Sequence, residues 1–188
     1  MKNQYTKFVK YLEKQENIYM QRAGESVYMT DGKVVLRVPV VWYNNMIRPL
    51  SGLLPDLPDD CTAAKHISDV LVTVQPGGMD IRQAVDKLST GKIVRQSRFL
   101  LELPPVGRSK KPVLVRLFKG DDGGDIIGIN DVFVDIFAEC CAGEPWRSDG
   151  RAVSPLVQAS DDTTLVMFPI RINPDIFGIW RDLQNENR

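Results

Sequence analysis

The chain has 188 residues, of which 43% are hydrophobic and 26% charged, a composition typical of a folded globular protein. Its 24 basic and 24 acidic side chains give a net charge of zero, so a contact with nucleic acid or an anionic membrane would need a local basic patch. The polar N-terminus has no signal-peptide pattern, and no apolar run is long enough to cross a membrane. Three cysteines, two of them adjacent at Cys140 and Cys141, suit a reducing compartment better than a disulfide framework, and we expect a cytoplasmic protein.

The first predicted element is a helix over residues 4–15. Its apolar face is formed by residues at helical spacing, namely Tyr5, Phe8, Val9 and Leu12. Lys7, Lys10 and Lys14 follow one another at i, i+3 and i+7 on the polar side. Such a basic stripe is typical of a solvated helix surface and, less commonly, of a phosphate-binding one.

Strand-like runs follow at 18–22 and 26–38, and Asp31-Gly32, a strong turn signal, can divide the second run into a hairpin of its own. Residues 39–63 are rich in proline and aspartate and predict a loop or an insertion. The leucines at positions 50, 53, 54 and 57 are expected to pack over an edge of the protein or against a partner.

A further strand is predicted at residues 66–75. It begins at His66, the only histidine, which we expect to be structural or solvated. After the strand, Asp80 can cap a helix with the apolar face Ile81, Ala84, Val85 and Leu88. Gly91 is expected to close that helix.

Two more strands, at 92–103 and 112–119, are joined by a basic tip at residues 107–111. Arg108, Lys110 and Lys111 in this tip are candidate phosphate contacts, although a soluble hairpin end is the simpler interpretation. The Gly-rich turn after the second strand contains Asp121, Asp122 and Asp125. Their spacing lacks the ligand pattern of a calcium loop, and we expect no metal there.

The clearest pattern runs from Ile129 to Ile172. It predicts a helix capped by Asn130, with Val132, Phe133, Ile136 and Phe137 on its apolar face and Asp131, Asp135 and Glu139 facing out. Two β-branched runs around Ala-Ser-Asp-Asp-Thr then predict a hairpin. The same order of helix, strand, turn and strand occurs in residues 5–40, which indicates a possible internal two-fold repeat.

The constellations that catalysis needs are missing from the sequence. It has no Gly-rich phosphate loop with its lysine and no Cys/His metal spacing, and a nucleophile would depend on the single His66 as base. We therefore expect a binding protein with no cofactor and no metal, not an enzyme. An unrecognised acidic site around Asp121, Asp122 and Asp125 is the enzymatic alternative.

Several short segments resemble the last domain of the bacterial replicative sliding clamp, the processivity subunit of the chromosomal DNA polymerase. The segments are Ile-Ile-Gly-Ile-Asn at 126–130, the helix at 132–139, Ser-Pro-Leu-Val at 154–157 and Leu-Val-Met-Phe-Pro-Ile-Arg-Ile at 165–172. The last of these occupies the place of the family's terminal signature. Residues 28–39 fit the other half of such a domain, and the middle of the chain has no counterpart.

The resemblance implies an α+β, DNA-clamp-like domain of two pseudo-two-fold-related halves, each a helix with an antiparallel sheet. We expect a single domain over residues 1–188. Half one covers about 1–95 and includes the insertion at 39–63, half two covers about 96–172, and residues 173–188 form a C-terminal extension. By the same resemblance, Phe168, Pro169, Ile170 and Arg171 would border a hydrophobic cleft for partner peptides, which Phe177 or Trp180 of the extension would fill from within.

Two functions follow from these expectations. The first is a non-catalytic, DNA-associated clamp-like protein, a replication accessory or mobile-element protein that contacts double-stranded DNA through phosphates and meets replication proteins. The family has three such domains per chain, so a clamp of this size would need a homo-oligomer. The alternative is a protein-interaction module that reuses the clamp fold without binding DNA, which the zero net charge, the acidic second helix and the Leu-rich insertion at residues 50–57 favour.

Overall fold

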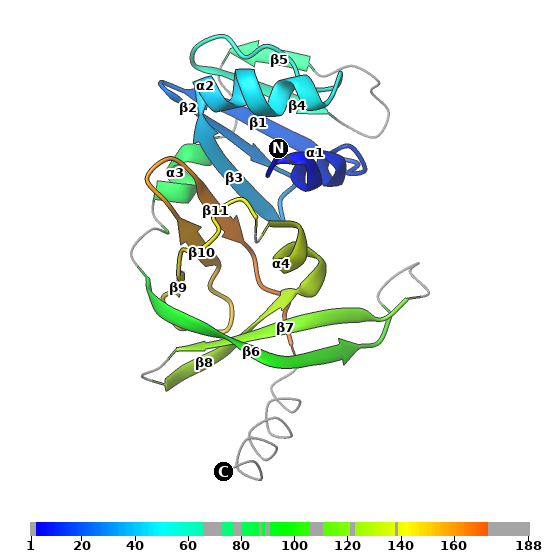
Figure 1. Ribbon diagram of the computed structural model, residues 1–188, viewed down its shortest axis with the longest axis vertical. Coiled ribbons are helices and arrows are strands. Elements are labelled where there is room, and N and C mark those ends of the chain that lie inside the picture. The colour runs from blue at the N-terminus through cyan, green and yellow to red at the C-terminus, as the bar shows by residue number, and fades with distance from the viewer. Residues whose placement is uncertain are drawn as a thin grey trace.

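The computed structural model describes residues 3–65, 73–76, 80–86, 88, 91–105, 111–120, 123–137 and 139–172. Within these residues the strands form one antiparallel sheet in the order β5-β4-β1-β2-β3-β11-β10-β9-β6-β7-β8 (Figure 1). The strands are β1 Ile18–Ala23, β2 Ser26–Thr30, β3 Val34–Pro39, β4 Cys61–Lys65, β5 Thr73–Pro76, β6 Lys92–Leu103, β7 Val113–Gly120, β8 Gly123–Asn130, β9 Trp146–Ser148, β10 Leu156–Ala159 and β11 Thr164–Met167. The helices are α1 Thr6–Leu12, α2 Val40–Trp42, α3 Ile81–Asp86 and α4 Asp131–Phe137. The expected α+β class is confirmed.

Two strand meanders meet at the centre of the sheet. Helix α1 precedes β1, β2 and β3, and α4 precedes β9, β10 and β11. Strand β3 pairs with β11 in antiparallel register, from Val34 opposite Met167 to Arg37 opposite Thr164. The predicted order of a helix and then a hairpin is therefore present at both ends of the described chain, whereas a two-fold relation between the halves stays a prediction.

The main core lies between the sheet and the pair of helices α1 and α4, which lie side by side (Figure 1). Tyr5, Phe8, Val9 and Leu12 are all buried, as their spacing predicted. The Phe8 and Phe137 rings meet edge to face, with their centroids 5.3 Å apart. The Tyr11 ring meets Phe133 in the same way at 5.5 Å. Aromatic packing thus joins the two ends of the chain.

Helix α4 begins as predicted but is rotated relative to the prediction. The Asn130 side chain caps it, since its Oδ1 accepts a hydrogen bond from the Val132 backbone N–H at 3.1 Å. Asp131, expected to face out, is buried and ion-paired, with Oδ1 2.7 Å from Arg116 Nη2 on β7. Val132, expected in the core, is 53% exposed. The contact with Arg116 draws Asp131 inward, and the buried face becomes Phe133, Val134 and Phe137.

The stretch at residues 39–63, predicted as a loop or an insertion, is a loop only at residues 51–60, and its remaining parts form regular elements. Helix α2 continues into a wide π-helical turn, Tyr43–Ile47, and a tight turn, Arg48–Leu50. Leu54 and Leu57 join the main core, whereas Leu50 is 37% exposed. The last residues of the stretch begin strand β4, which pairs with β1.

The strand predicted at 66–75 is described only in its last part. Residues 73–75 belong to β5, which pairs antiparallel with β4, and residues 66–72 lie outside the described residues. His66 lies outside the described residues. The helix after this region is confirmed, because Asp80 Oδ1 accepts the Gln83 backbone N–H at 3.1 Å. Ile81 and Val85 pack in a second cluster of buried residues, together with Val157 and Val166.

Strands β6, β7 and β8 form the far end of the sheet, where β6 and β7 make a long curved hairpin (Figure 1). Val115 and Leu117 of β7 form a third cluster with Ile170 and Ile172, which follow β11. A Cβ added at Gly128 of β8 would lie 2.1 Å from Ile172 Cδ1. Glycine at 128 therefore lets the chain after β11 run closely over β8.

Candidate functional site

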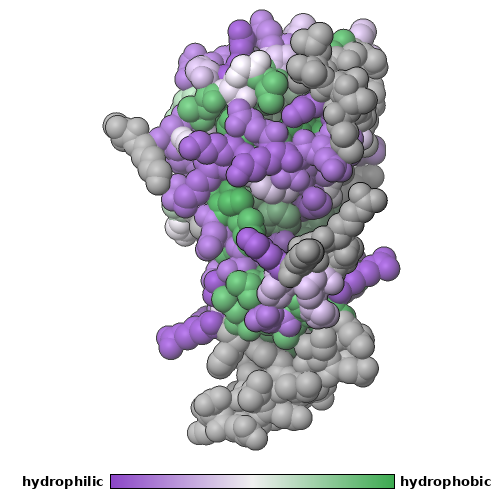
Figure 2. Space-filling view, turned by 90° about the vertical axis from the view of Figure 1, so that its right-hand side faces the viewer, coloured by the Kyte–Doolittle hydropathy of each residue, from purple (hydrophilic) through white to green (hydrophobic). Residues whose placement is uncertain are grey.

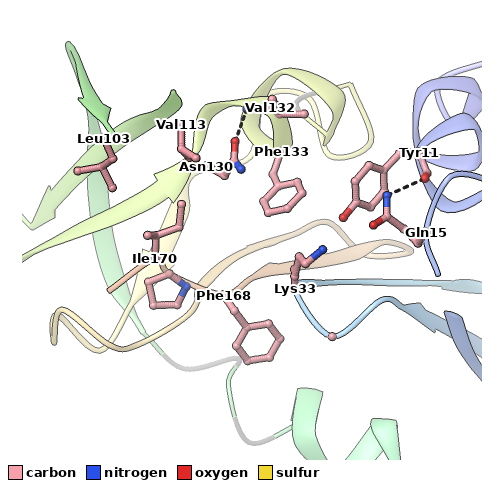
Figure 3. A pocket seen from close by; sticks show the side chains of 12 residues that line it. Tyr11, Gln15, Lys33, Leu103, Val113, Asn130, Val132, Phe133, Phe168 and Ile170 are labelled. Carbon is pink, nitrogen blue, oxygen red and sulfur yellow. Dashed lines mark hydrogen bonds between the residues drawn. The ribbon is translucent and has the colours of Figure 1, made fainter. Parts of the chain in front are cut away.

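A groove of about 580 Å³ opens between α1, the β2–β3 turn, the adjoining ends of β6 and β7, the start of α4 and the segment after β11. We call it the α1–α4 groove. It is lined by Tyr11, Gln15, Gly32, Lys33, Leu103, Val113, Asn130, Val132, Phe133, Phe168, Pro169 and Ile170 (Figure 3). Three of the four residues expected to border a partner cleft, Phe168, Pro169 and Ile170, lie here, and Arg171 is the exposed residue that follows them.

Apolar side chains dominate this groove and several reach solvent. Val132 is 53% exposed and Phe168 37% exposed, whereas Phe133 beneath them is buried. On the face of the molecule seen in Figure 2, hydrophobic surface shows in the lower half, beneath a broad hydrophilic band. Exposed apolar groups gathered in a concave site are typical of a binding surface.

Backbone hydrogen bonds hold the wall that follows β11. The Phe168 N–H donates to the Lys33 carbonyl oxygen at 2.9 Å, and the Ile170 N–H donates to the Gly128 carbonyl oxygen at 2.8 Å. These bonds tie the segment to the end of the β2–β3 turn on one side and to β8 on the other. The wall is therefore part of the sheet framework and not a free tail.

A buried carboxylate braces the opposite wall. The Tyr11 hydroxyl donates to Asp31 Oδ2, and the Lys33 and Val34 backbone N–H groups donate to Asp31 Oδ1 at 2.9 and 3.1 Å. The Asp31 side chain is only 1% exposed. Burial, followed by the bond to Asp31, raises the pKa of Tyr11, so its hydroxyl stays protonated and keeps donating.

The predicted DNA contacts on α1 and just after it differ in their surroundings. Lys7 Nζ lies 2.7 Å from Glu139 Oε1, and this hydrogen bond raises the Lys7 pKa. Lys10 and Lys14 are exposed, and among the described residues no carboxylate is within ion-pair distance of either. The first lysine of the stripe is thus partly neutralised by the acidic end of α4.

The basic tip between β6 and β7 is described only in part. Lys111 is exposed and lies two residues before Val113, which lines the groove. Arg108 and Lys110 lie outside the described residues, as do Phe177 and Trp180 of the C-terminal extension. Lys14 likewise lies next in sequence to Gln15, which lines the groove. Basic residues are therefore close in sequence to the groove lining at two points of the chain.

The acidic turn and the cysteines offer no catalytic geometry in the part of the chain that is described. Asp121 and Asp122 are outside it, and Asp125 Oδ2 accepts the Ala152 backbone N–H at 3.0 Å. No described group of three or more His, Cys, Asp or Glu side chains could hold a metal ion. Burial raises the pKa of Cys140 and of Cys141 to about 12, so neither thiol is a nucleophile near neutral pH.

None of the described helices has the length and apolar character that crossing a bilayer requires.

Sequence reasoning found one wall of the groove and missed the rest. The helical and strand patterns give no sign that Tyr11 and Lys33 line a groove, although Asp31-Gly32 marks the turn beside Lys33. Leu103 and Val113 reach the groove through the long β6–β7 hairpin. Nothing in the local pattern places these two residues beside Phe168, which follows them by 65 and 55 positions in the chain.

No family model matches the chain, and no curated protein sequence matches it either. Among solved structures, a DNA polymerase III beta chain from Streptococcus pneumoniae aligns with 91% of this chain and 64% of its own, at 10% identity and a TM-score of 0.38. A DnaN sliding clamp, DNA polymerase III subunit beta, from Bartonella birtlesii bound to griselimycin aligns with 92% of this chain and 60% of its own, at 15% identity and a TM-score of 0.34.

This chain therefore spans between 60% and 64% of the length of those structures.

Proposed function

We propose that this chain is a non-catalytic binding protein that holds a short segment of a protein partner in the α1–α4 groove. The observation that carries the proposal is the groove itself, a concave site with Val132 and Phe168 exposed at its surface. Its volume of about 580 Å³ falls in the range of roughly 300–1,000 Å³ that holds a compact ligand, which suits a few side chains and not a whole helix.

The proposal includes a clamp-like domain whose two halves are related by a pseudo-two-fold. In support, α1 with β1–β3 and α4 with β9–β11 adjoin at the antiparallel β3–β11 pair, and the two helices pack together on the main core. Residues 39–63 are then an insertion that carries α2 and leads into β4. The resemblance to sliding clamps would give Phe168–Ile170 a place at a partner cleft, and the groove lining that these residues form supports this part of the proposal.

A selection from displayed random octapeptides tests the groove. The immobilised chain is expected to enrich peptides with apolar residues, and Val132→Asp is expected to abolish the enrichment because a carboxylate would occupy the opening. Val153→Asp is the matched control, since Val153 is 65% exposed and does not line the groove. Selection of the same peptides by wild type and Val132→Asp would refute the groove as the site.

A second candidate function is non-specific binding of double-stranded DNA through phosphates. The observation in its favour is the pair of exposed lysines Lys10 and Lys14, with Lys111, Arg108 and Lys110 as further candidates. Against this function, the Lys7 ammonium group is already ion-paired with Glu139. One such domain does not surround a duplex, so this function also requires a homo-oligomer.

Fluorescence anisotropy with a labelled duplex at low and high salt, together with light scattering, tests the DNA candidate. Phosphate contacts predict an affinity that falls steeply with salt and is lost in Lys10→Glu/Lys14→Glu but retained in Lys119→Glu, whose lysine is on β7. A monomer that is indifferent to DNA at low salt would remove this candidate and leave the groove as the function.

A further inference from the structure

We propose that the partner segment is an extended, acidic and apolar peptide, whose carboxylate pairs with Lys33 at the mouth of the α1–α4 groove. This inference rests on the proposed function and adds the chemistry of the partner. It follows from the charges of the groove, from the state of the carboxylates around it and from the amide groups in its walls.

Lys33 is the only charged residue among those that line the groove within the described chain. Its side chain is 62% exposed, and its Nζ lies 3.7 Å from Asp31 Oδ2. The Lys7–Glu139 pair is much closer, at 2.7 Å. Lys33 is therefore held only loosely and keeps donor capacity for a carboxylate that enters from solvent.

Asp31 is the acidic group nearest to Lys33, and its position matters for the balance of charge. Its carboxylate is 1% exposed and already accepts hydrogen bonds from Tyr11 and from two backbone N–H groups. It thus lies beneath the surface with its acceptor capacity largely used. An incoming peptide meets the ammonium group of Lys33 and not the carboxylate of Asp31.

Acidic residues on α4 are also engaged away from the groove mouth. Asp131 pairs with Arg116 at 2.7 Å, and Asp135 lies near Lys7, whose pKa it helps to raise. Exposed residues that adjoin the lining in sequence carry both signs, as Lys14 and Glu16 do on either side of Gln15. Among the described residues, the charge that lines the groove is therefore that of Lys33, which favours an acidic partner and disfavours a basic one.

Two amide side chains leave groups that suit the backbone of an extended peptide. Asn130 uses its Oδ1 to cap α4, which leaves its NH2 as a donor. Gln15 uses its Nε2 to bond the Tyr11 carbonyl oxygen at 3.0 Å, which leaves its Oε1 as an acceptor. An extended peptide presents C=O and N–H groups along its length, which such a donor and such an acceptor can bind at separate positions. Figure 3 shows both side chains at the groove, with apolar groups between the walls.

The same octapeptide selection, scored for charge, tests the inference. The wild-type chain is expected to enrich peptides that combine apolar residues with Asp or Glu, and Lys33→Glu is expected to enrich Lys or Arg in their place. A selected acidic peptide is expected to bind Lys33→Gln about tenfold more weakly, the size expected for loss of one charge-assisted hydrogen bond. Its affinity for wild type should fall with added salt more than its affinity for Lys33→Gln.

The outcomes separate the two proposals. Apolar peptides with no charge preference, or the same preference in Lys33→Glu, would overturn the acidic partner and leave the groove function standing. If every peptide selected by the wild-type chain is also selected by Val132→Asp, or if the wild-type chain selects none, both proposals are overturned. Lys10→Glu is the control for a general effect of surface charge, because Lys10 is exposed on α1 but does not line the groove.

Discussion

The Tyr11 hydroxyl donates a hydrogen bond to the Asp31 carboxylate and so joins α1 to the β2–β3 turn. The residues are twenty positions apart, and each is linked to the groove: Tyr11 lines it, and Asp31 orders the turn that presents Lys33. Since the Asp31 side chain is 1% exposed, water cannot replace a partner that is removed.

Tyr11→Phe is expected to lower the free energy of unfolding by about 1.5–3 kcal/mol, because a buried carboxylate loses a donor. Tyr43→Phe is the matched control. The Tyr43 hydroxyl donates to the neutral Pro55 carbonyl oxygen at 2.7 Å, and its loss is expected to cost about 0.5–1.5 kcal/mol. Urea unfolding of the two variants measures both values, and an equal or smaller loss in Tyr11→Phe would contradict the buried-carboxylate account.

Arg116 and Asp131 form a partly buried ion pair, with side chains 18% and 12% exposed. Arg116→Ala is expected to destabilise the fold by about 1.5–3 kcal/mol, since it leaves the Asp131 charge without its donor. Lys7→Ala, which breaks the exposed pair with Glu139, is expected to change stability by no more than the error of the measurement. Thermal unfolding would contradict this ranking if Lys7→Ala proved the more damaging.

Gly91 lies against the backbone of Ser148 on β9. An added Cβ would come within 2.5 Å of the Ser148 carbonyl carbon, and backbone cannot move aside as a side-chain end can. Gly91→Ala is therefore expected to destabilise by about 1–3 kcal/mol or more, as overpacking does. Gly52→Ala, where a Cβ meets nothing within 4 Å, should be neutral or slightly stabilising in the same unfolding assay.

Cys140 and Cys141 predict a loss of stability at high pH. Burial raises both thiol pKa values from 9.0 to about 12 in the fold, so above pH 9 the unfolded chain binds fewer protons than the native one. The free energy of unfolding should then fall as the pH rises from 9 towards 12. The free energy of unfolding of the double variant Cys140→Ala/Cys141→Ala is expected to fall less steeply over the same pH range. An unchanged slope would show that other groups cause the loss of stability.

Local patterns in the sequence predicted the elements whose reasons are local. Helix α1 buries its predicted face because residues spaced three and four apart share one side of a helix. The turn at Asp31-Gly32 forms because Gly32 adopts φ +86°, which glycine tolerates without strain. The cap at Asn130 was predicted for the same kind of reason, since it involves only residues two positions apart.

The failures depend on partners that are distant in the sequence. The helical pattern predicts Asp131 on the solvent side of α4, because it cannot show that the partner of Asp131 is Arg116 on strand β7. Strand β4 was read as loop because its pairing with β1 links residues more than forty positions apart. For the groove, the terminal signature marked one wall, but the other walls come together only through the sheet order.

The pairing of β3 with β11 has a consequence for synthesis on the ribosome. Strand β3 is translated by residue 39, yet its partner is complete only at residue 167. Until β11 is synthesised, the edge of β3 that pairs with it is open, and the backbone N–H and C=O groups along that edge of the β1–β2–β3 meander are unpaired. Contacts of such long sequence separation form slowly. The emerging chain thus exposes a strand edge that can pair with another chain. Aggregation of this protein would therefore be decided during translation, when a chaperone can cover that edge.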